Sequence, residues 1–306
     1  MSLTPAAAET LRNVLATAVV VPVTPYQADG DPDWDTYASL ASCLVDGGIT
    51  VITPNGNTGE FYALTQAEAR RAVETAAKVT SGRAELLAGV GHDIASAVEA
   101  ARHAQDHGVR MIMIHQPVHP YVSAEGWIDY HAAIAGAVPD LGVVLYVRDE
   151  RRTGGQIAEL ADRSPNIVGV KYGVRDATKF ASVARDAGID RVTWLAGAAE
   201  LTAPAFWAVG AHGFTSGLAN VSPRLALAML DALRANDFAA AMKAWESVRR
   251  FEELRLADAS ADNVSVVKEA LAQLGLCRAD VRPPSRPLPA DIKQEITGIL
   301  ASWGLK

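Results

Sequence analysis

One lysine, Lys171, ends an otherwise apolar segment that begins at Ile167. A lysine that faces a protein interior loses solvation, so its neutral amine is favoured and becomes a nucleophile toward carbonyl groups. The chemistry this predicts is formation of an imine, or Schiff base, with a carbonyl substrate. The alternative is a lysine whose stem lies along the apolar segment while its ammonium reaches a surface carboxylate.

A tyrosine suited to the same chemistry, Tyr146, stands near the end of the apolar segment Gly142–Val147. A phenol near an amine can move protons during imine formation, and also when the carbon next to the imine loses a proton. If the two segments are consecutive strands, Tyr146 and Lys171 can face the same cavity. The alternative is a tyrosine that only caps the apolar core.

A loop with two glycines reads PNGNTGE over residues 54–60 and follows another apolar segment. The glycines let the backbone approach a ligand closely, and the backbone N–H groups could hold a carboxylate. Thr58 could pass a proton to or from the tyrosine. An ordinary tight turn would explain the same residues.

Three arginines, Arg148, Arg151 and Arg152, follow Tyr146 closely. One of them could bind a distal substrate carboxylate through two parallel hydrogen bonds. The acidic residues between them favour a solvated charge cluster as the alternative, which we expect for at least one of the three.

Two histidines, His115 and His119, flank the end of a fourth apolar segment, and two histidines can indicate a metal. No third ligand has suitable spacing, so we expect no metal site there. The two cysteines, Cys43 and Cys277, are far apart and outside any metal-type pattern. We expect two buried free thiols, which fits a reducing cytosol.

The elements that must position these residues follow one rhythm, in which a short apolar segment precedes an amphipathic helical stretch. Several segments are apolar at consecutive positions, which is typical of parallel strands buried on both faces. Eight such units predict right-handed crossovers and an α/β fold of the closed (β/α)8, or TIM, barrel type. The alternative, a doubly wound open sheet, is disfavoured because no GxGxxG follows the first strand. The predicted strands are Thr17–Val23, Thr50–Thr53, Ala84–Gly89, Arg110–His115, Gly142–Val147, Ile167–Tyr172, Val192–Ala196 and Gly213–Gly217.

Helix signals separate these strands. Thr65 and Glu68 form a predicted capping box, Ser123 is placed to start a helix, and Pro223 suits a first helical turn. Three further helices are predicted after the eighth unit. We therefore expect a barrel over residues 1–230 and a helical extension over residues 231–306 that packs on it. The predicted extra helices are Phe238–Leu256, Asn263–Leu274 and Ala290–Trp303.

Composition restricts the function further. The chain has 306 residues and a formal net charge of −7, which argues against a nucleic-acid partner because such proteins carry a basic surface. We find no apolar run of the roughly 18 residues that a membrane span needs, and no signal peptide. We therefore expect a cytoplasmic protein that acts on a small molecule.

Together, these motifs resemble the dihydrodipicolinate synthase / N-acetylneuraminate lyase family. The likeness covers nearly the whole chain, and the joint order of its motifs is specific. The motifs are the GNTGE loop after strand two, the tyrosine ending strand five, the lysine ending strand six, Thr24-Pro25, GFTSG at 213–217 with Asn220, and Asn263 followed by Lys268.

The resemblance implies roles for the candidate residues. Lys171 would form the imine with a 2-oxo acid, Tyr146 would act as general acid and base, and Thr58 would relay protons. The substrate carboxylate would be held by Gly56, Asn57 and Thr58, and the loop containing Gly217 would complete the substrate site. The family also implies a homotetramer built as a dimer of dimers and no cofactor.

Departures from the lysine-pathway synthase concern the substrate. Asn57 replaces the first of two threonines, and His119 or Val118 stands where that enzyme has a tyrosine that reaches a neighbouring subunit's site. The stretch after Tyr146 resembles the branch that dehydrates and decarboxylates 5-dehydro-4-deoxyglucarate. Arg148 or Arg152 would then bind the second carboxylate.

Three other functions remain open at this stage. One is pyruvate condensation of the dihydrodipicolinate synthase kind. Another, of a different class, is a non-catalytic family member that binds a metabolite, although such a protein would not need a lysine, a tyrosine and a threonine together. The third, a metal-dependent class II aldolase, lacks a ligand set.

Overall fold

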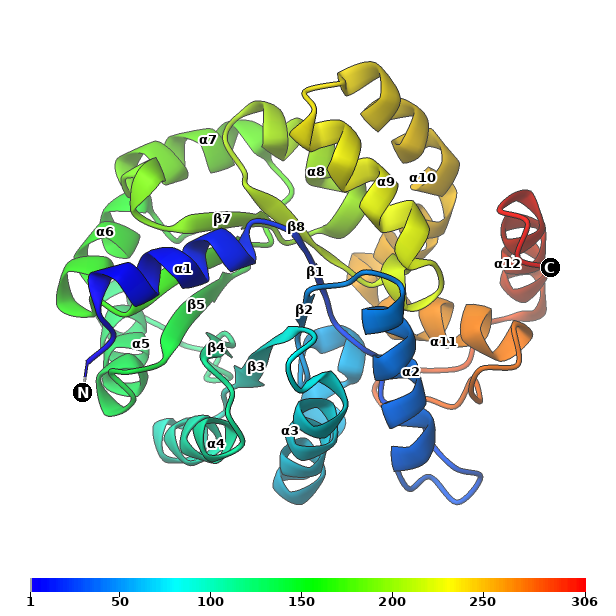
Figure 1. The fold of residues 1–306 in the computed structure, drawn as a ribbon, viewed down its shortest axis with the longest axis horizontal. Helices are drawn as coiled ribbons and strands as arrows, with labels where there is room; N and C mark the ends of the chain where they lie inside the picture. The colour runs from blue at the N-terminus through cyan, green and yellow to red at the C-terminus, as the bar shows by residue number, and fades with distance from the viewer. Residues whose placement is uncertain (1) are drawn as a thin grey trace.

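Eight parallel strands close into a barrel in the computed structural model, which describes residues 2–306. The strands follow chain order around the barrel, and β1 pairs with both β2 and β8 (Figure 1). The predicted (β/α)8 barrel is confirmed, and the fifth and sixth strands have their predicted bounds. The strands are β1 Ala18–Val20, β2 Val51–Ile52, β3 Glu85–Val90, β4 Met111–Ile114, β5 Gly142–Val147, β6 Ile167–Tyr172, β7 Thr193–Ala196 and β8 Gly213–Ser216.

Helices surround the strands, and several begin where local sequence signals predict. The Thr65–Glu68 capping box is present, the Ser123 side chain accepts a hydrogen bond from Gly126 N, and Pro223 starts α9. The helices are α1 Pro5–Leu15, α2 Trp34–Asp46, α3 Gln66–Thr80, α4 Ile94–Asp106, α5 Ala124–Ala137, α6 Gly154–Arg163, α7 Ala177–Asp186, α8 Ala199–Ala208, α9 Pro223–Arg234, α10 Phe238–Ser260, α11 Asn263–Gln273 and α12 Ala290–Ser302. Short 3-10 turns are η1 Asn57–Gly59, η2 Phe61–Ala63, η3 Ile189–Arg191 and η4 Leu218–Asn220.

The first helix, α1, was not predicted, and it lies across one end of the barrel (Figure 1). Its buried Leu11 and Leu15 join the cluster of side chains that fills the barrel interior. A Cβ atom placed on Gly142 would lie 2.7 Å from Leu11 Cδ1, and one on Gly169 would lie 3.1 Å from Leu15 Cδ1. Glycines in β5 and β6 therefore make room for this helix, and α1 closes the barrel opposite the carboxyl ends of the strands.

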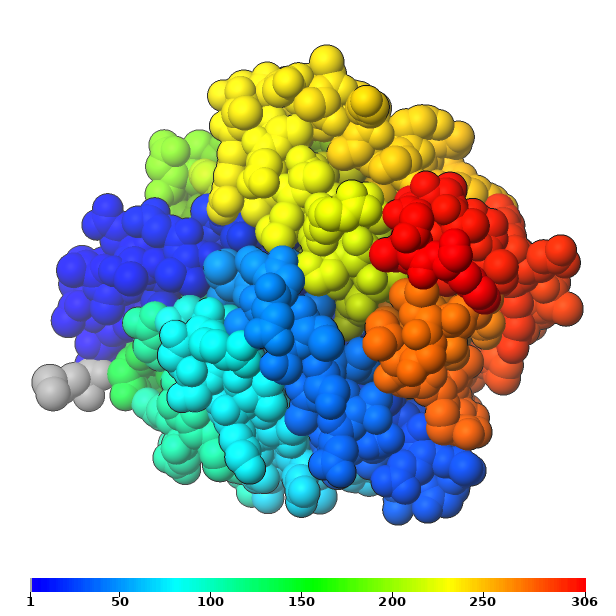
Figure 2. All heavy atoms as spheres, turned by 45° about the vertical axis from the view of Figure 1, so that its right-hand side comes forward, coloured from blue at the N-terminus to red at the C-terminus, as the bar shows by residue number. Residues whose placement is uncertain are grey.

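The C-terminal extension packs on the barrel helices. Helix α10 contacts α8 and α9, and α11 lies beside α2 in both views (Figures 1 and 2). The backbone of α10 leaves helical geometry at Ala257, one residue after the predicted end at Leu256. Residue 230 falls inside α9, so the last barrel helix continues to Arg234.

Two smaller observations complete the description. Cys43 is exposed on α2 and Cys277 is partly buried, so the expectation of two buried thiols is wrong for Cys43, and both are free. Within residues 2–306, no helix is long and apolar enough to cross a membrane.

Candidate active site

The site begins with a direct pairing of two strands. In the β5–β6 ladder Tyr146 lies opposite Lys171, and a shift in register between Val143 and Val144 precedes this pair. Both side chains are buried, and Lys171 Nζ lies 4.4 Å from the centroid of the Tyr146 ring. The structure therefore brings the two predicted residues together at the carboxyl end of the barrel, where such barrels carry their active sites.

Burial changes the acidity of Lys171. Loss of solvation, with further contributions from the positive charges of Arg148 and Arg255, lowers the pKa of Lys171 to about 7. With such a pKa about half of the amine is neutral at pH 7, whereas an ordinary lysine has on the order of 0.1 % or less in that form. A buried neutral amine can attack a carbonyl carbon.

The phenol of Tyr146 has the opposite shift. Burial raises the pKa of Tyr146, although the positive charge of Arg148 and a hydrogen bond from Asn57 Nδ2, at 3.3 Å, partly oppose the rise. The phenol is therefore protonated at neutral pH and can give a proton to a group beside Lys171.

The glycine loop lies against this pair. Asn57 and Thr58 line the same pocket as Tyr146 and Lys171, and Thr58 is buried. Gly56 has a packing role, because a Cβ atom there would lie 2.5 Å from Val21 Cγ1. Absence of a side chain at this position lets the loop approach the segment after β1.

A buried histidine, His115, forms a hydrogen bond with the glycine loop. His115 Nε2 lies 2.8 Å from the carbonyl oxygen of Asn55, so this nitrogen carries the proton and donates it. The ring stacks on Phe61 with centroids 4.3 Å apart, and burial lowers the pKa of His115 to about 3. His115 is therefore neutral and positions the loop.

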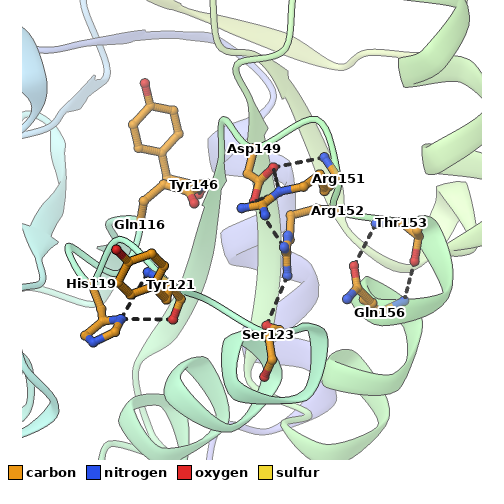
Figure 3. Close-up of polar contacts among 10 residues, drawn as sticks. All are labelled: Gln116, His119, Tyr121, Ser123, Tyr146, Asp149, Arg151, Arg152, Thr153 and Gln156. Atoms are coloured by element: carbon orange, nitrogen blue, oxygen red, sulfur yellow. Dashed lines mark hydrogen bonds and ion pairs between the residues drawn. The ribbon is translucent and has the colours of Figure 1, made fainter.

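Three of the predicted substrate residues, Gly56, Arg152 and His119, do not line the pocket. The Arg152 side chain is buried, forms an ion pair with Asp149 at 3.0 Å and donates to Ser123 O at 3.4 Å. His119 is exposed and accepts a hydrogen bond from Tyr121 N. Figure 3 shows both side chains on the side toward α5, whereas the Tyr146 ring points the other way. Arg152 thus secures the loop after β5.

Three arginines line the pocket, and sequence reasoning named only one of them, Arg148. The second, Arg175, follows β6, and the third, Arg255, comes from α10. Arg148 and Arg175 are exposed at the mouth, whereas Arg255 is buried. No local signal marks Arg255, because it belongs to a helix rich in arginine and glutamate.

Arg255 is held in place by its neighbours. Its guanidinium donates to Glu252 Oε1 at 2.6 Å and to Asn263 Oδ1 at 2.7 Å, while its Nε has no hydrogen-bond partner. A Cβ atom on Gly217 would lie 2.1 Å from Arg255 Nη2, so only glycine leaves room for this side chain. Gly217, predicted as a site residue, lines the pocket, and its lack of a side chain leaves space for the Arg255 guanidinium.

Two buried carboxyl groups, those of Glu200 and Glu252, lie near Arg255. Glu200 on α8 accepts a hydrogen bond from Ser216 Oγ at 2.5 Å, and Ser216 lines the pocket. Burial and the neighbouring charge of Glu252 raise the pKa of Glu200, so it is protonated at neutral pH. One negative charge then remains in the cluster, on Glu252, and it balances Arg255.

The charges around the pocket share one sign. Lys171, Arg148, Arg175 and Arg255 line it, and among residues 2–306 no aspartate or glutamate does so. Glu252, the ion-pair partner of Arg255, does not line the pocket, so the arginines present positive charge to it. This arrangement favours an anionic ligand, because each arginine can bind a carboxylate.

The extension also holds the glycine loop. Buried Glu60, which has a left-handed backbone with φ 60°, forms an ion pair with Lys268 Nζ on α11 at 2.5 Å. Its second oxygen accepts from Arg282 N at 2.8 Å, and Lys268 also donates to Asp280 O. The loop that carries Asn57 and Thr58 is thus tied to the C-terminal extension.

A parallel barrel with a buried lysine and tyrosine in a cation-lined pocket defines an enzyme of the lyase class. Residues 14–302 match the dihydrodipicolinate synthetase family, and the chain belongs to this family. Sequence reasoning had indicated this family, and the indication is confirmed.

Relatives in the family carry two different activities in their names. The chain is 30% identical over 287 residues to a 4-hydroxy-tetrahydrodipicolinate synthase of Phenylobacterium zucineum, covering 92% of this chain and 95% of the relative. It is 31% identical over 311 residues to a Methylobacterium radiotolerans protein named "Probable 5-dehydro-4-deoxyglucarate dehydratase", covering 98% of each. The crystal structure of dihydrodipicolinate synthase from Bacillus clausii superposes with a TM-score of 0.93 and 40% identity, covering 96% of this chain and 99% of that one.

Proposed function

We propose that the protein is a lyase that binds a 2-oxo acid as an imine on Lys171. The observation that carries this proposal is the buried amine of Lys171, its pKa lowered to about 7, 4.4 Å from the Tyr146 ring in a pocket lined by cations. A structural lysine would need no such pocket. A protein that only binds a metabolite would not need a neutral amine beside a protonated phenol.

The chemistry follows from these groups. The amine of Lys171 attacks the 2-oxo carbon, and the resulting carbinolamine loses its hydroxyl as water with a proton from Tyr146. The imine then accepts the electron pair left when the neighbouring carbon loses a proton. Thr58 relays protons between Tyr146 and the substrate, and Asn57 and Thr58 hold the carboxylate next to the imine, in a loop whose approach Gly56 permits.

The arginines favour a substrate with a second carboxylate. A hydroxylated 2-oxo diacid would place this group at Arg148, Arg175 or Arg255, and would lose a hydroxyl as water once the imine has activated the carbon between them. This agrees with the relatives named as 5-dehydro-4-deoxyglucarate dehydratases. Condensation on pyruvate, as in the relatives named as synthases, is the alternative, and it would need no diacid site of this kind.

Further parts of the proposal rest on likeness to the family. The enzyme would be a homotetramer, a dimer of dimers, that works in the cytoplasm without a cofactor. Residues after Arg234 would act with the barrel as one unit. Sedimentation of the purified chain measures its oligomeric state. A dimer or monomer at micromolar concentration would contradict the proposed tetramer.

Imine trapping tests the proposal directly. The protein is incubated with pyruvate, or with 5-dehydro-4-deoxyglucarate, and reduced with borohydride, and the adduct is located by peptide mass. We expect an adduct on Lys171, none in Lys171→Ala, and an unchanged adduct in Lys179→Ala, whose lysine lies on α7. A folded protein that gives no adduct with either acid would favour the non-catalytic alternative. Release of water from the diacid, followed by product mass, distinguishes dehydration from condensation.

A further inference from the structure

A second group of chemistry-bearing side chains lies on the outer helices. Helix α4 carries His103 and is capped by His107, so the two imidazoles lie on the same face of this helix, with ring centroids 4.4 Å apart. Glu74 on the neighbouring helix α3 faces them, with Oε1 3.4 Å from His103 Nε2. One ligand atom from each of the three residues lies within 4.8 Å of the others.

The hydrogen bonds of the two rings leave nitrogen lone pairs available to a metal. His107 Nδ1 lies 2.8 Å from the carbonyl oxygen of His103, so Nδ1 carries the proton and Nε2 keeps its lone pair. Metal-bound histidines commonly donate their second nitrogen to a backbone carbonyl in this way, which fixes the tautomer and the ring orientation. His103 Nε2 is buried and has no hydrogen-bond partner, and such groups are rare in folded proteins.

The local field favours a cation. The two histidines lie at the C-terminal end of α4, where the unpaired carbonyl groups carry partial negative charge. Glu74 adds a full negative charge, and the chain as a whole has a net charge of −7. Two arginines and two acidic residues surround the same groove as His103, so these charges balance: Arg70, Arg102, Glu99 and Asp106.

We propose that Glu74, His103 and His107 bind one transition-metal ion of the Zn²⁺ type on the outside of the barrel. Two imidazoles and one carboxylate form a ligand set that suits Zn²⁺, with water in the fourth position. The ion joins α3 to α4 and does not take part in the reaction at Lys171. This site is independent of the proposed lyase function, and sequence reasoning weighed only the histidines at the end of strand four.

Binding of the ion stabilises the folded chain, because the unfolded chain does not hold the three ligands together. A rise in the melting temperature with Zn²⁺ is therefore expected, and it disappears when a ligand is removed. An ion pair between protonated His103 and Glu74 is the competing explanation, and it gives no dependence on Zn²⁺.

Calorimetric titration of the metal-free, tag-free full chain with Zn²⁺ tests the site. We expect one ion per chain, about tenfold or more loss of affinity in His107→Ala and in Glu74→Gln, and no change in His119→Ala, which removes another exposed histidine. His107 is exposed, so its replacement leaves the fold intact, and circular dichroism checks this. No binding by the unmodified chain, unchanged affinity in either ligand variant, or an equal loss in His119→Ala would overturn the proposal.

Discussion

At the scale of single residues, burial is what makes the amine of Lys171 reactive. Its amine is buried at the carboxyl end of the barrel, and the charges that act on it are those of Arg148 and Arg255. Both effects disfavour the ammonium form. The same arginines that would attract an anionic substrate thus also keep the amine reactive.

The pH dependence of imine trapping follows from this arrangement. The pKa of Lys171 is lowered to about 7, so the reactive neutral amine increases as the pH rises through 7 and is scarce below pH 6. We expect the initial rate of borohydride trapping with pyruvate to rise from pH 6 to 8 with a midpoint near 7. A rate that keeps rising to pH 10 would mean that the lysine has an ordinary pKa.

Recognition of the second carboxylate can be tested at Arg255. Arg255→Lys keeps the positive charge opposite Glu252 but loses the planar pair of donors. We expect KM for a 2-oxo diacid to rise by about tenfold or more, since a charge-assisted hydrogen bond contributes about 1.5–3 kcal/mol, with little change for pyruvate. Arg152→Lys, which alters a buried arginine outside the pocket, is the matched control. Equal effects of Arg255→Lys on both acids would contradict the assignment.

Individual residues differ in how far the sequence reveals them. Lys171 and Tyr146 could be predicted because a polar residue at the carboxyl end of an apolar barrel strand lies where such barrels carry their active site. Arg152 is close to Tyr146 in sequence, yet it pairs with Asp149 and turns toward α5. Arg255 was missed because the contact that brings it to Gly217 joins residues far apart in the chain, which periodicity does not encode.

At the scale of elements, the glycine loop depends on a helix outside the barrel. Glu60 and Lys268 are both buried, and each would be an isolated charge without the other. Breaking such a pair by removing one partner typically costs about 3–5 kcal/mol, because the remaining charge is uncompensated.

We expect Lys268→Met to lower the free energy of unfolding by about 3–5 kcal/mol and to weaken substrate binding through the loop. The double variant Glu60→Gln with Lys268→Met should regain part of this loss, since no unpaired charge remains. Denaturant unfolding of the single and double variants measures both effects. A single variant as stable as the unmodified chain would show that the ion pair does not hold the loop.

The elements themselves were largely predictable, with one instructive exception. Strand segments were recognised by consecutive apolar residues and helices by their caps. Helix α1 was missed because it precedes the first strand and belongs to no strand–helix unit. Its signals were local, namely Thr4 as N-cap and Pro5 at the first position, but its role of closing the barrel depends on Gly142 and Gly169 far along the chain.

At the scale of the whole molecule, the barrel topology could be predicted from the repeated strand–helix pattern. The contribution of the C-terminal extension to the site could not be predicted in this way. The division into residues 1–230 and 231–306 treats the extension as packing alone. In the structure the extension supplies Arg255 to the pocket wall and Lys268 to the loop.

A truncated chain ending at Asn236, after α9, tests this dependence. We expect it to lose stability and imine trapping together, because the buried faces of α8 and α9 become exposed and Glu60 loses its partner. Circular dichroism and trapping with pyruvate measure the two properties. A truncated protein that folds and traps pyruvate at the normal rate would show that the barrel is autonomous.

Because Gly217 has no side chain, a residue of α10 can reach the pocket that β5 and β6 also line. In the proposed function, Arg255 of α10 reaches the far end of the substrate through the gap that this glycine leaves, while β5 and β6 supply the reacting end. Substitutions along α10 are therefore expected to alter which acid is accepted, whereas the pairing of Lys171 with Tyr146 depends on β5 and β6. Variation in the C-terminal extension is thus a route to new substrates in this family, and engineering of α10 could change the substrate of this enzyme by the same route.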